Sequence, residues 1–445
     1  MHTTTPTAVS PLQAAIDRSA MTPIQISVVV LCALIAFVEG ADIGLVPLLA
    51  PQIIKEWGLP PAAITSILAA GPVGLAVGGI AMGYLGDLVG RRPALIGTMV
   101  LMTLGTLATA WAGSTIEMIL CRLVTGIGFG GVVPAATALV SEFTPLRRRT
   151  QLISLVILMQ AVGGLAFIFT LSQIGQAYHW QTLILTVGAI CLAVTVLTIL
   201  FLPESARYLL VTDPHGRRTD RMLHRLRLTG EDEIRRMVDV PARKGARISQ
   251  LFEQGRAQGT LLLWVAFFGL SMLIGFATQW LALIYTYAGK SSAVAVNALL
   301  AFQIGGIFSG LVLPLISRRV GVTLVLAATM LLGSAAVLVL GLAVTGSNVI
   351  IYVMTGLAGV FISGSLFIIY SPTVTFYPTE IRSTGSGTAT SVGRIGNILA
   401  PIIAGSLLAG GFSPTNILMV FAVPLLLSSL AIFLFRVRCE NLATE

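Results

Sequence analysis

Charged residues are what this sequence has least of. Asp, Glu, Lys and Arg make up 10% of its 445 residues, while hydrophobic residues make up 56% and the mean hydropathy is +0.92. Soluble domains carry roughly 25% charged residues, and a water-soluble fold of this composition has too few polar groups to cover its surface. The composition therefore excludes an ordinary soluble protein and predicts an all-α membrane protein with many spans.

Cysteine is also scarce, with four in the chain: Cys32, Cys121, Cys191 and Cys439. Three of them lie inside apolar runs, and none has the spacing of a redox pair or of metal ligands. The sequence likewise shows no phosphate-binding loop and no pairing of a nucleophile with a base. We therefore expect no disulfide framework, no metal site, no cofactor and no enzymatic activity.

Long polar segments are rare, and long apolar runs take their place. A helix that crosses the hydrocarbon core of a bilayer needs about 20 apolar residues. Scanning for such runs predicts twelve spans, at residues 24–50, 62–84, 94–112, 116–140, 150–172, 182–202, 260–286, 293–316, 322–344, 348–371, 385–408 and 415–435. The one long polar segment divides the chain into a tail at 1–23, a six-helix bundle at 24–202, a central loop at 203–259, a second six-helix bundle at 260–436 and a tail at 437–445.

The basic residues are distributed unevenly. All but four of the 27 lysines and arginines lie in the tails, the central loop or other loops after even-numbered spans; the exceptions are Lys55, Lys290, Arg122 and Arg394. Because positively charged loops stay on the cytoplasmic side, we expect a multi-pass protein of the cytoplasmic (inner) membrane with both termini in the cytoplasm. The net charge of +9 then reflects topology and contact with anionic lipid head groups, so we expect no nucleic-acid partner.

The second half of the chain resembles the first. GGIAMGYLGDLVGRR (78–92) and GGIFSGLVLPLISRR (305–319) share GGIxxG and a terminal Arg pair at the same spacing. EFTPLRRRT (142–150) and FYPTEIRST (376–384) share a Pro-x-x-x-Arg before spans 5 and 11. Two similar six-span halves are typical of a transporter built from repeats, with its substrate site between the halves.

Several of these stretches are recognisable as family motifs. GYLGDLVGRRP (83–93) resembles the loop 2–3 motif of the major facilitator superfamily, and LPESARYLL (202–210) resembles its PES motif after span 6. Residues 39–42, 121–149 and 377–401 resemble the aromatic acid:proton symporter branch of that family. The resemblance implies two pseudo-symmetric six-helix bundles, the major facilitator fold, and proton-coupled import of a small aromatic carboxylate, such as a hydroxybenzoate, by alternating access.

Other cargoes stay open at this point. They include a different organic anion, such as muconate or a phenylpropionate, and a sugar, which the PES motif alone would suit. A receptor would need an added signalling domain, and neither tail is long enough to hold one. We expect the partners to be a small aromatic acid, protons and membrane lipids, and the protein to act as a monomer.

The loop motif also predicts a gate. Gly83 and Gly86 permit close helix packing, and Gly90 permits a tight turn. The resemblance implies a cytoplasmic latch that forms in the outward-facing state and breaks in the inward-facing one; a plain topogenic loop is the alternative. The candidate gating residues are Gly83, Asp87, Gly90, Arg91, Arg92, Glu142, Arg149 and Arg382. Glu142 is the candidate acceptor for Arg91 or Arg92 in the latch, with solvated loop charges as the alternative.

Two acids of the first span are the candidates for proton coupling. Glu39 and Asp42 lie three residues apart, so they share one helix face, which we expect to line the central cavity. A charge in the hydrocarbon costs about 2.5–3.5 kcal/mol on insertion scales, so each buried acid requires a partner or a function. We expect these carboxyl groups to load and release the coupled proton.

Arg122 of the fourth span is the candidate partner of Asp42. Both lie roughly 9–12 Å below the outer surface, at a helical rise of 1.5 Å per residue. If spans 1 and 4 are neighbours, as the family fold implies, the two side chains pair, and protonating Asp42 frees Arg122 to bind a substrate carboxylate. A purely structural ion pair is the alternative.

Further side chains are candidates for substrate binding. Arg394 of span 11 is available for a carboxylate or for a backbone carbonyl, and the amides of Gln303 and Asn397 for a phenolic hydroxyl, because a buried amide requires a partner. The aromatic residues expected near the cavity are Phe37, Phe129, Trp280, Tyr285, Phe302 and Tyr370. Of these, Phe37 and Trp280 are the candidates to stack on an aromatic ring, with a packing or lipid-facing role as the alternative.

Overall fold

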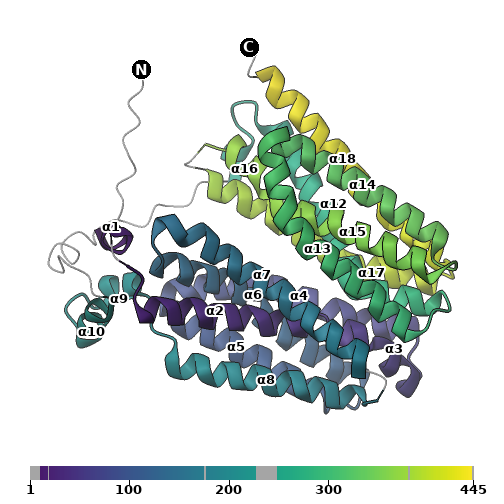
Figure 1. Cartoon of the computed structure of the whole chain (residues 1–445), viewed down its shortest axis with the longest axis horizontal. Coiled ribbons are helices and arrows are strands. Elements are labelled where there is room, and N and C mark those ends of the chain that lie inside the picture. Colours follow the sequence, from purple (N-terminus) through teal and green to yellow (C-terminus); the bar gives the residue numbers. More distant parts are fainter. Residues whose placement is uncertain (1–10, 19, 175–176, 227–247, 379–380, 443–445) are drawn as a thin grey trace.

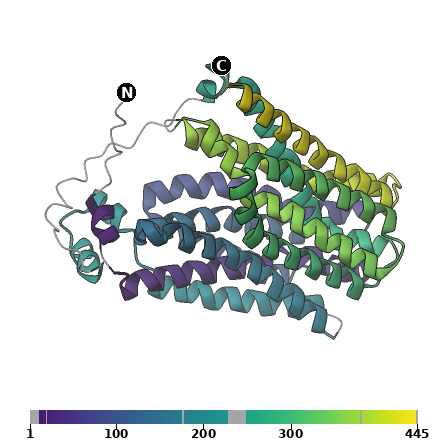
Figure 2. The same cartoon turned by 45° about the horizontal axis from the view of Figure 1, so that its top comes forward.

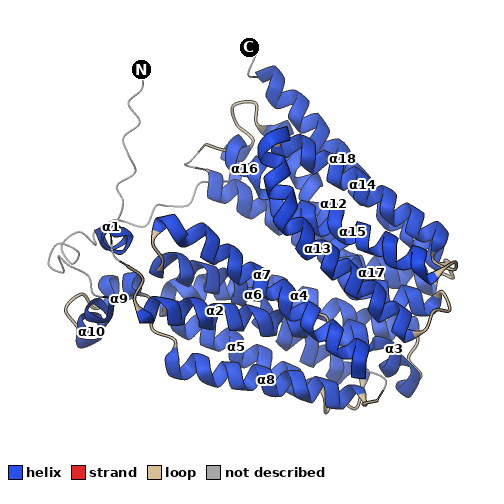
Figure 3. Cartoon of the chain, viewed as in Figure 1, coloured by secondary structure: helices blue, strands red, loops and turns tan. Residues whose placement is uncertain are grey.

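A computed structural model describes the chain except residues 1–10, 19, 175–176, 227–247, 379–380 and 443–445, which Figure 1 draws as a thin grey trace. The regular secondary structure of the described residues is entirely helical (Figure 3). Twelve continuous or broken helices among them are long and apolar enough to cross a membrane. The predicted fold of twelve membrane-spanning helices is therefore confirmed.

The spans form two bundles of six. The N-terminal bundle contains α2 (Pro23–Ile43) with α3 (Leu45–Trp57), α4 (Pro61–Val89), α5 (Arg91–Thr109), α6 (Thr115–Phe143), α7 (Leu146–Ile174) and α8 (Trp180–Phe201). The C-terminal bundle contains α12 (Ala257–Tyr287), α13 (Ser292–Val320), α14 (Val322–Ala343), α15 (Asn348–Ile368) with α16 (Tyr370–Phe376), α17 (Arg382–Ala409) and α18 (Pro414–Leu442). The spans are flanked by short helices α1 (Pro11–Arg18), α9 (Ala206–Thr212), α10 (Arg217–Leu226) and the 3-10 helix η1 (Ile248–Leu251).

The first span is broken and is longer than predicted. The sequence predicted an end near residue 50, whereas α3 continues to Trp57 and ends where Gly58 adopts the left-handed conformation. Lys55 does not stop this helix, because a cation in the last turn interacts favourably with the helix dipole. The break lies at Gly44, directly after the turn that holds Asp42.

The helix pairs within the two bundles correspond to each other. In the N-terminal bundle α4 packs on α6, α2 on α7 and α5 on α8. In the C-terminal bundle the equivalent spans pack in the same way, α13 on α15, α12 on α17 and α14 on α18. The sequence similarity between the halves therefore corresponds to the same helix packing in each half.

Glycines set the closest of these contacts. A Cβ at Gly78 would overlap the backbone of Ile127, and a Cβ at Gly305 would overlap the carbonyl oxygen of Gly356. Both glycines begin the repeated GGIxxG motif, and each faces the fourth span of its half. Without a hydrophobic driving force between helices in lipid, such small residues allow backbones to approach and gain dispersion energy.

Replacing Gly78 with Ala is expected to lower the free energy of unfolding by about 1–3 kcal/mol, the usual cost of overpacking. The added methyl group meets rigid backbone, so α4 and α6 must move apart. Thermal unfolding of the purified protein measures the effect. Gly71→Ala on the same helix is the matched control, because a Cβ there meets nothing within 4 Å. Equal midpoints for the two variants would contradict the packing argument.

The bundles converge at one end and diverge at the other (Figure 1). Where they converge, α3 contacts α12, and Thr65 of α4 lies directly beside Gly405 of α17. Further along, α4 contacts α17 and α7 contacts α13. The bundles diverge toward the end that carries α1, α9, α10 and the last turn of α18, which we call the terminus-bearing end. Figure 2 shows the two bundles side by side from a second direction.

Candidate functional site

A cavity of about 350 Å³ lies between the two bundles. Four helices of the N-terminal bundle and four of the C-terminal bundle line it, together with α3, so that any ligand there contacts both halves. Its size falls within the range of about 300–1,000 Å³ that is usual for small-molecule sites. Most of the lining is apolar, and the polar lining residues are Arg122, Gln160, Thr278, Gln279, Gln303, Ser363 and Asn397.

Arg122 is paired with Asp42 at this cavity. Arg122 is 4% exposed, and its Nη1 lies 3.4 Å from Oδ1 of Asp42, which is fully buried. The other carboxylate oxygen of Asp42 accepts a hydrogen bond from the hydroxyl group of Thr106 on α5. Both oxygens of this acid are therefore satisfied, as a buried charge requires. The structure brings together the two residues that sequence analysis placed at one depth.

Glu39 lies one helical turn before Asp42 and has a different environment. It is 2% exposed, and its side chain is hydrogen-bonded to that of Gln160 on α7. Its Oε2 has no hydrogen-bond partner among the described residues. Neither acid lines the cavity itself, contrary to expectation. Each reaches it through one polar neighbour, Glu39 through Gln160 and Asp42 through Arg122.

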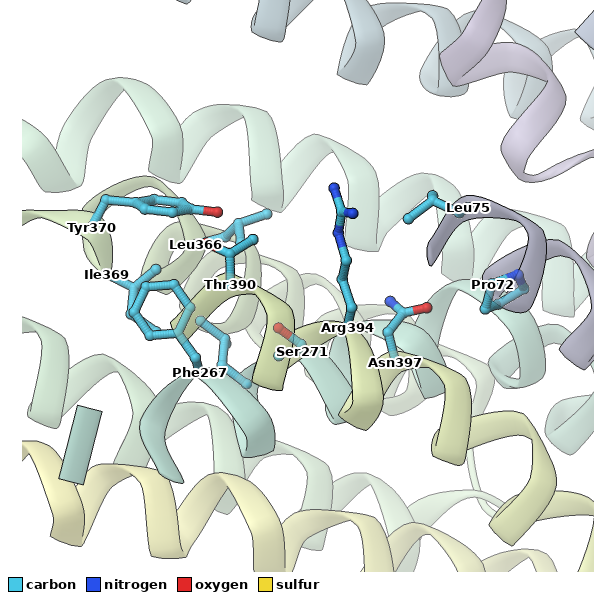
Figure 4. Close-up of a pocket in the computed structure, with 12 residues that line it drawn as sticks. Pro72, Leu75, Phe267, Ser271, Leu366, Ile369, Tyr370, Thr390, Arg394 and Asn397 are labelled. Carbon is cyan, nitrogen blue, oxygen red and sulfur yellow. The ribbon is translucent and has the colours of Figure 1, made fainter. Parts of the chain in front are cut away.

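The other polar candidates lie on the C-terminal side of the cavity. Gln303 lines it, and its Nε2 donates a hydrogen bond of 3.0 Å to the carbonyl oxygen of Ala161, which joins α13 to α7. Asn397 lines both this cavity and a smaller one of about 100 Å³. Arg394 lines only the smaller one, which Figure 4 shows with Asn397 beside it on α17.

The structure corrects the two aromatic candidates. Neither Phe37 nor Trp280 lines the cavity, and Trp280 is fully buried. The backbone of Phe37 instead packs against Gly163 in the contact between α2 and α7. The aromatic rings that do line the cavity are those of Phe129 and Phe302, which the sequence analysis also expected near it, and of Phe367. The Phe129 ring also lies 5.9 Å from the guanidinium carbon of Arg122.

Thr106 and Gln160 are site residues that sequence reasoning missed. Gln160 carried a usable signal, since an amide inside an apolar run requires a partner, the same argument that singled out Gln303 and Asn397. Thr106 carried none, because a threonine inside a helix usually donates to the carbonyl four residues earlier. Thr106 does so to Met102 at 2.9 Å in addition to donating to Asp42.

Three of the candidate gating residues, Arg91, Arg92 and Glu142, form a charge cluster at the terminus-bearing end of the N-terminal bundle. Arg91 Nε lies 3.6 Å from Oε1 of Glu142, whose Oε2 accepts a hydrogen bond from Ser205. Arg92 donates from Nε to the Leu202 carbonyl oxygen at 2.7 Å, and its amide donates to Glu204 at 3.1 Å. The cluster thus joins α5, α6 and the chain leading into α9. Glu204 and Ser205, which belong to the PES motif, are further members that sequence analysis did not assign.

The pairing of Glu142 with Arg91 is one that the latch interpretation expects, and the latch itself stays a prediction. Every contact described for Arg91, Arg92 and Glu142 joins parts of the N-terminal bundle, and it is present although the bundles diverge at this end. Arg149 donates to the Thr144 carbonyl oxygen and Arg382 to that of Tyr377, each within its own half. The Asp87 side chain and the surroundings of Gly83 lie outside the described part of the structure. The cluster fixes the loop geometry of one bundle.

Gly90 forms the tight turn between α4 and α5 beside this cluster. Its φ of 104° lies in the left-handed region, and a Cβ there would lie 2.8 Å from Oε2 of Glu204. We expect Gly90→Ala to cost about 1–3 kcal/mol of stability through backbone strain and, by displacing Glu204, to slow turnover as well. The control is Gly321→Ala in the equivalent turn of the second bundle, where φ is 102° but nothing lies within 4 Å. Equal turnover rates for the two variants would exclude a role for Glu204.

Two six-helix halves with matching packing and a cavity between them are the architecture of a membrane transporter built from repeats. The sequence model of the Major Facilitator Superfamily matches residues 32–401. This is most of the chain, and the protein belongs to that family.

Similar proteins have been characterised in bacteria. The chain is 29% identical over 431 residues to the 4-hydroxybenzoate transporter PcaK of Pseudomonas aeruginosa, covering 95% of each protein. It is 30% identical to the gallate transporter of Pseudomonas putida, covering 94% of this chain and 93% of that one. It is also 30% identical to the 3-(3-hydroxy-phenyl)propionate transporter of Escherichia coli, covering 92% of this chain and 93% of that protein.

The architecture also matches a solved structure. A crystal structure of a D-xylose-proton symporter superimposes with a TM-score of 0.73, covering 92% of this chain and 97% of that one. The two sequences are 16% identical, so this similarity establishes the fold alone.

Proposed function

We propose that the protein is a proton-coupled symporter that imports a small aromatic carboxylate across the cytoplasmic membrane. The observation that carries this proposal is the pairing of Arg122, which lines the cavity between the bundles, with the buried Asp42. The three relatives named above, all transporters of hydroxylated aromatic acids by name, support the same class of cargo.

The lining of the cavity suits an aromatic acid. Arg122 is a guanidinium group, which matches a carboxylate through two parallel hydrogen bonds. Phe129 and Phe302 offer apolar faces for a ring, and the amides of Gln303 and Asn397 offer donors and acceptors for ring hydroxyl groups. No carboxylate side chain is among the lining residues of the described structure, so nothing there repels an anion.

Charge balance explains how the two cargoes are coupled. With Asp42 ionised, the pair with Arg122 is neutral and offers little to an anion. Protonation of Asp42 leaves Arg122 as an isolated cation in a low-dielectric site, which is costly until a substrate carboxylate neutralises it. Proton and anion therefore load together, and the site is neutral both empty and full.

The orientation follows from the basic residues. Arg91, Arg92, Arg147, Arg148 and the Arg318–Arg319 pair lie at the ends of spans on the terminus-bearing side. By the positive-inside rule this side faces the cytoplasm. Divergence of the bundles on that side supports assigning the present arrangement to the inward-facing state of an alternating-access cycle.

The test is uptake of radiolabelled 4-hydroxybenzoate, gallate and 3-(3-hydroxyphenyl)propionate into proteoliposomes, with and without an imposed inward proton gradient. We expect accumulation of at least one of these acids only when the gradient is present. Gradient-independent uptake would reject proton coupling, and uptake of muconate or of a sugar in place of all three acids would reject the assigned cargo. Protein-free liposomes correct for passive entry of the protonated acid.

A further inference from the structure

We propose that Arg394 forms a second anion station, which takes over the substrate carboxylate on the terminus-bearing side of the main cavity. It receives the carboxylate when Asp42 has ionised again and reclaimed Arg122. This inference rests on the proposed function. It adds a second binding position for the carboxylate, apart from Arg122 in the cavity between the bundles.

The station is the smaller cavity of about 100 Å³. Figure 4 shows the Arg394 side chain extended from α17, standing between Tyr370 and Leu75, with Asn397 next to it. Ser271 of α12 and Thr390, one turn before Arg394, add hydroxyl groups to the same lining. The cavity thus combines one guanidinium with hydroxyl and amide groups, which together supply the positive charge and the hydrogen-bond donors that bind a carboxylate.

The two arginines differ in their charge balance. Arg122 is neutralised by Asp42, whereas no carboxylate among the described side chains is paired with Arg394. Arg394 is partly buried, so its charge is poorly solvated. In this arrangement of the bundles an incoming or departing anion is therefore attracted more strongly to Arg394 than to Arg122.

The two cavities adjoin each other. Pro72, Leu75, Leu366 and Asn397 line both of them, so the proposed transfer takes the substrate past these four shared residues. Asn397 lies three residues after Arg394, on the same face of α17. Its amide is placed to contact the substrate in either cavity.

The second station lies closer to the terminus-bearing end. α17 begins at that end, and Arg394 is the thirteenth of its residues, roughly 18 Å along the helix. α6 begins at the opposite end, and Arg122 is the eighth of its residues, roughly 10 Å from that end. An anion that moves from Arg122 to Arg394 therefore moves toward the proposed cytoplasmic exit.

Gly79 on α4 leaves room for this guanidinium. A Cβ at Gly79 would occupy the space of the Arg394 Nη1 atom, the far end of a flexible side chain. Gly79→Ala therefore displaces the guanidinium without removing its charge. This variant tests the position of Arg394, while Arg394→Gln tests its charge.

The experiment measures binding of 4-hydroxybenzoate and of its uncharged methyl ester to the full-length protein in lipid nanodiscs. We expect Arg394→Gln to weaken binding of the acid by between about tenfold and a hundredfold, the range for one lost charge-assisted hydrogen bond. Binding of the ester changes little. We expect Gly79→Ala to weaken binding of the acid less than Arg394→Gln does, again without changing binding of the ester. Gly97→Ala, where a Cβ meets nothing within 4 Å, is the control for an added methyl group.

A double-mutant cycle separates the two stations. In Asp42→Asn, Arg122 is released from its ion pair and competes for the carboxylate. Adding Arg394→Gln to this variant should therefore weaken binding of the acid less than it does in the wild-type protein. If Arg394→Gln weakened binding of the acid and of the ester equally, the proposal of an anion station would be wrong, and Arg394 would have a structural role. If the wild-type protein binds neither 4-hydroxybenzoate nor gallate nor 3-(3-hydroxyphenyl)propionate, the proposed function fails first, which is a distinct outcome.

Discussion

Asp42→Asn is expected to abolish accumulation of the aromatic acid against its gradient while the purified protein still binds the acid. Asparagine cannot ionise, so it imitates the protonated acid and leaves Arg122 permanently released from its ion partner. The substrate then binds without a proton, and the imposed proton gradient no longer drives its movement. Accumulation in proteoliposomes and equilibrium binding to the same preparation are the two measurements.

The control for this variant is Asp213→Asn, which removes an exposed carboxylate between α9 and α10, away from the cavity. It should accumulate the acid like the wild type. Exchange of internal for external substrate should persist in Asp42→Asn, because exchange requires no net proton movement. Full gradient-driven accumulation by Asp42→Asn would refute the coupling role and leave the pair with Arg122 as a structural one.

Arg122→Gln is expected to have the second large effect, on stability as well as on binding. Breaking a buried ion pair from one side costs about 3–5 kcal/mol, because the remaining charge is left without a partner. Asp42 is fully buried, so this cost applies in full. Affinity for the acid should also fall by about tenfold or more, since one charge-assisted contact to the carboxylate is lost. Thermal unfolding and ligand binding in nanodiscs report the two effects separately.

The double variant Asp42→Asn with Arg122→Gln distinguishes these effects. It removes both charges, so stability should largely return while affinity for the acid stays low. Arg122→Lys should retain the fold and bind more weakly, because an ammonium group cannot contact a carboxylate through two parallel bonds. Unchanged affinity in Arg122→Gln would show that the carboxylate is held elsewhere, with Arg394 as the remaining basic side chain that lines the two cavities.

The membrane-spanning fold was predictable because lipid imposes strict conditions on sequence. Each span must supply a long apolar run, so all twelve spans could be read directly. The repeated GGIxxG motif also had a readable cause, since Gly78 and Gly305 occupy equivalent helix contacts. The helix break at Gly44 could not be predicted from the sequence, because glycine is common in continuous transmembrane helices as well.

The site was predictable where charge was involved. Asp42 and Arg122 stand out in apolar runs because lipid makes unpaired charge expensive, and their depths agree. Rotation of the helices about their own axes was not predictable. Both the lipid-facing and the protein-facing sides of a membrane helix are apolar, so the pattern that orients helices in soluble proteins is nearly lost.

The sequence by itself thus determined the number of spans, the repeat and the buried charges, because burial in lipid restricts which residues can stand where. Only the tertiary structure decided which side chains meet: that Phe129 and Phe302 line the cavity while Phe37 and Trp280 do not, and that Gln160 contacts Glu39. The physical reason is that these contacts depend on helix rotation and on neighbours distant in the chain, and a nearly uniform apolar surface encodes neither.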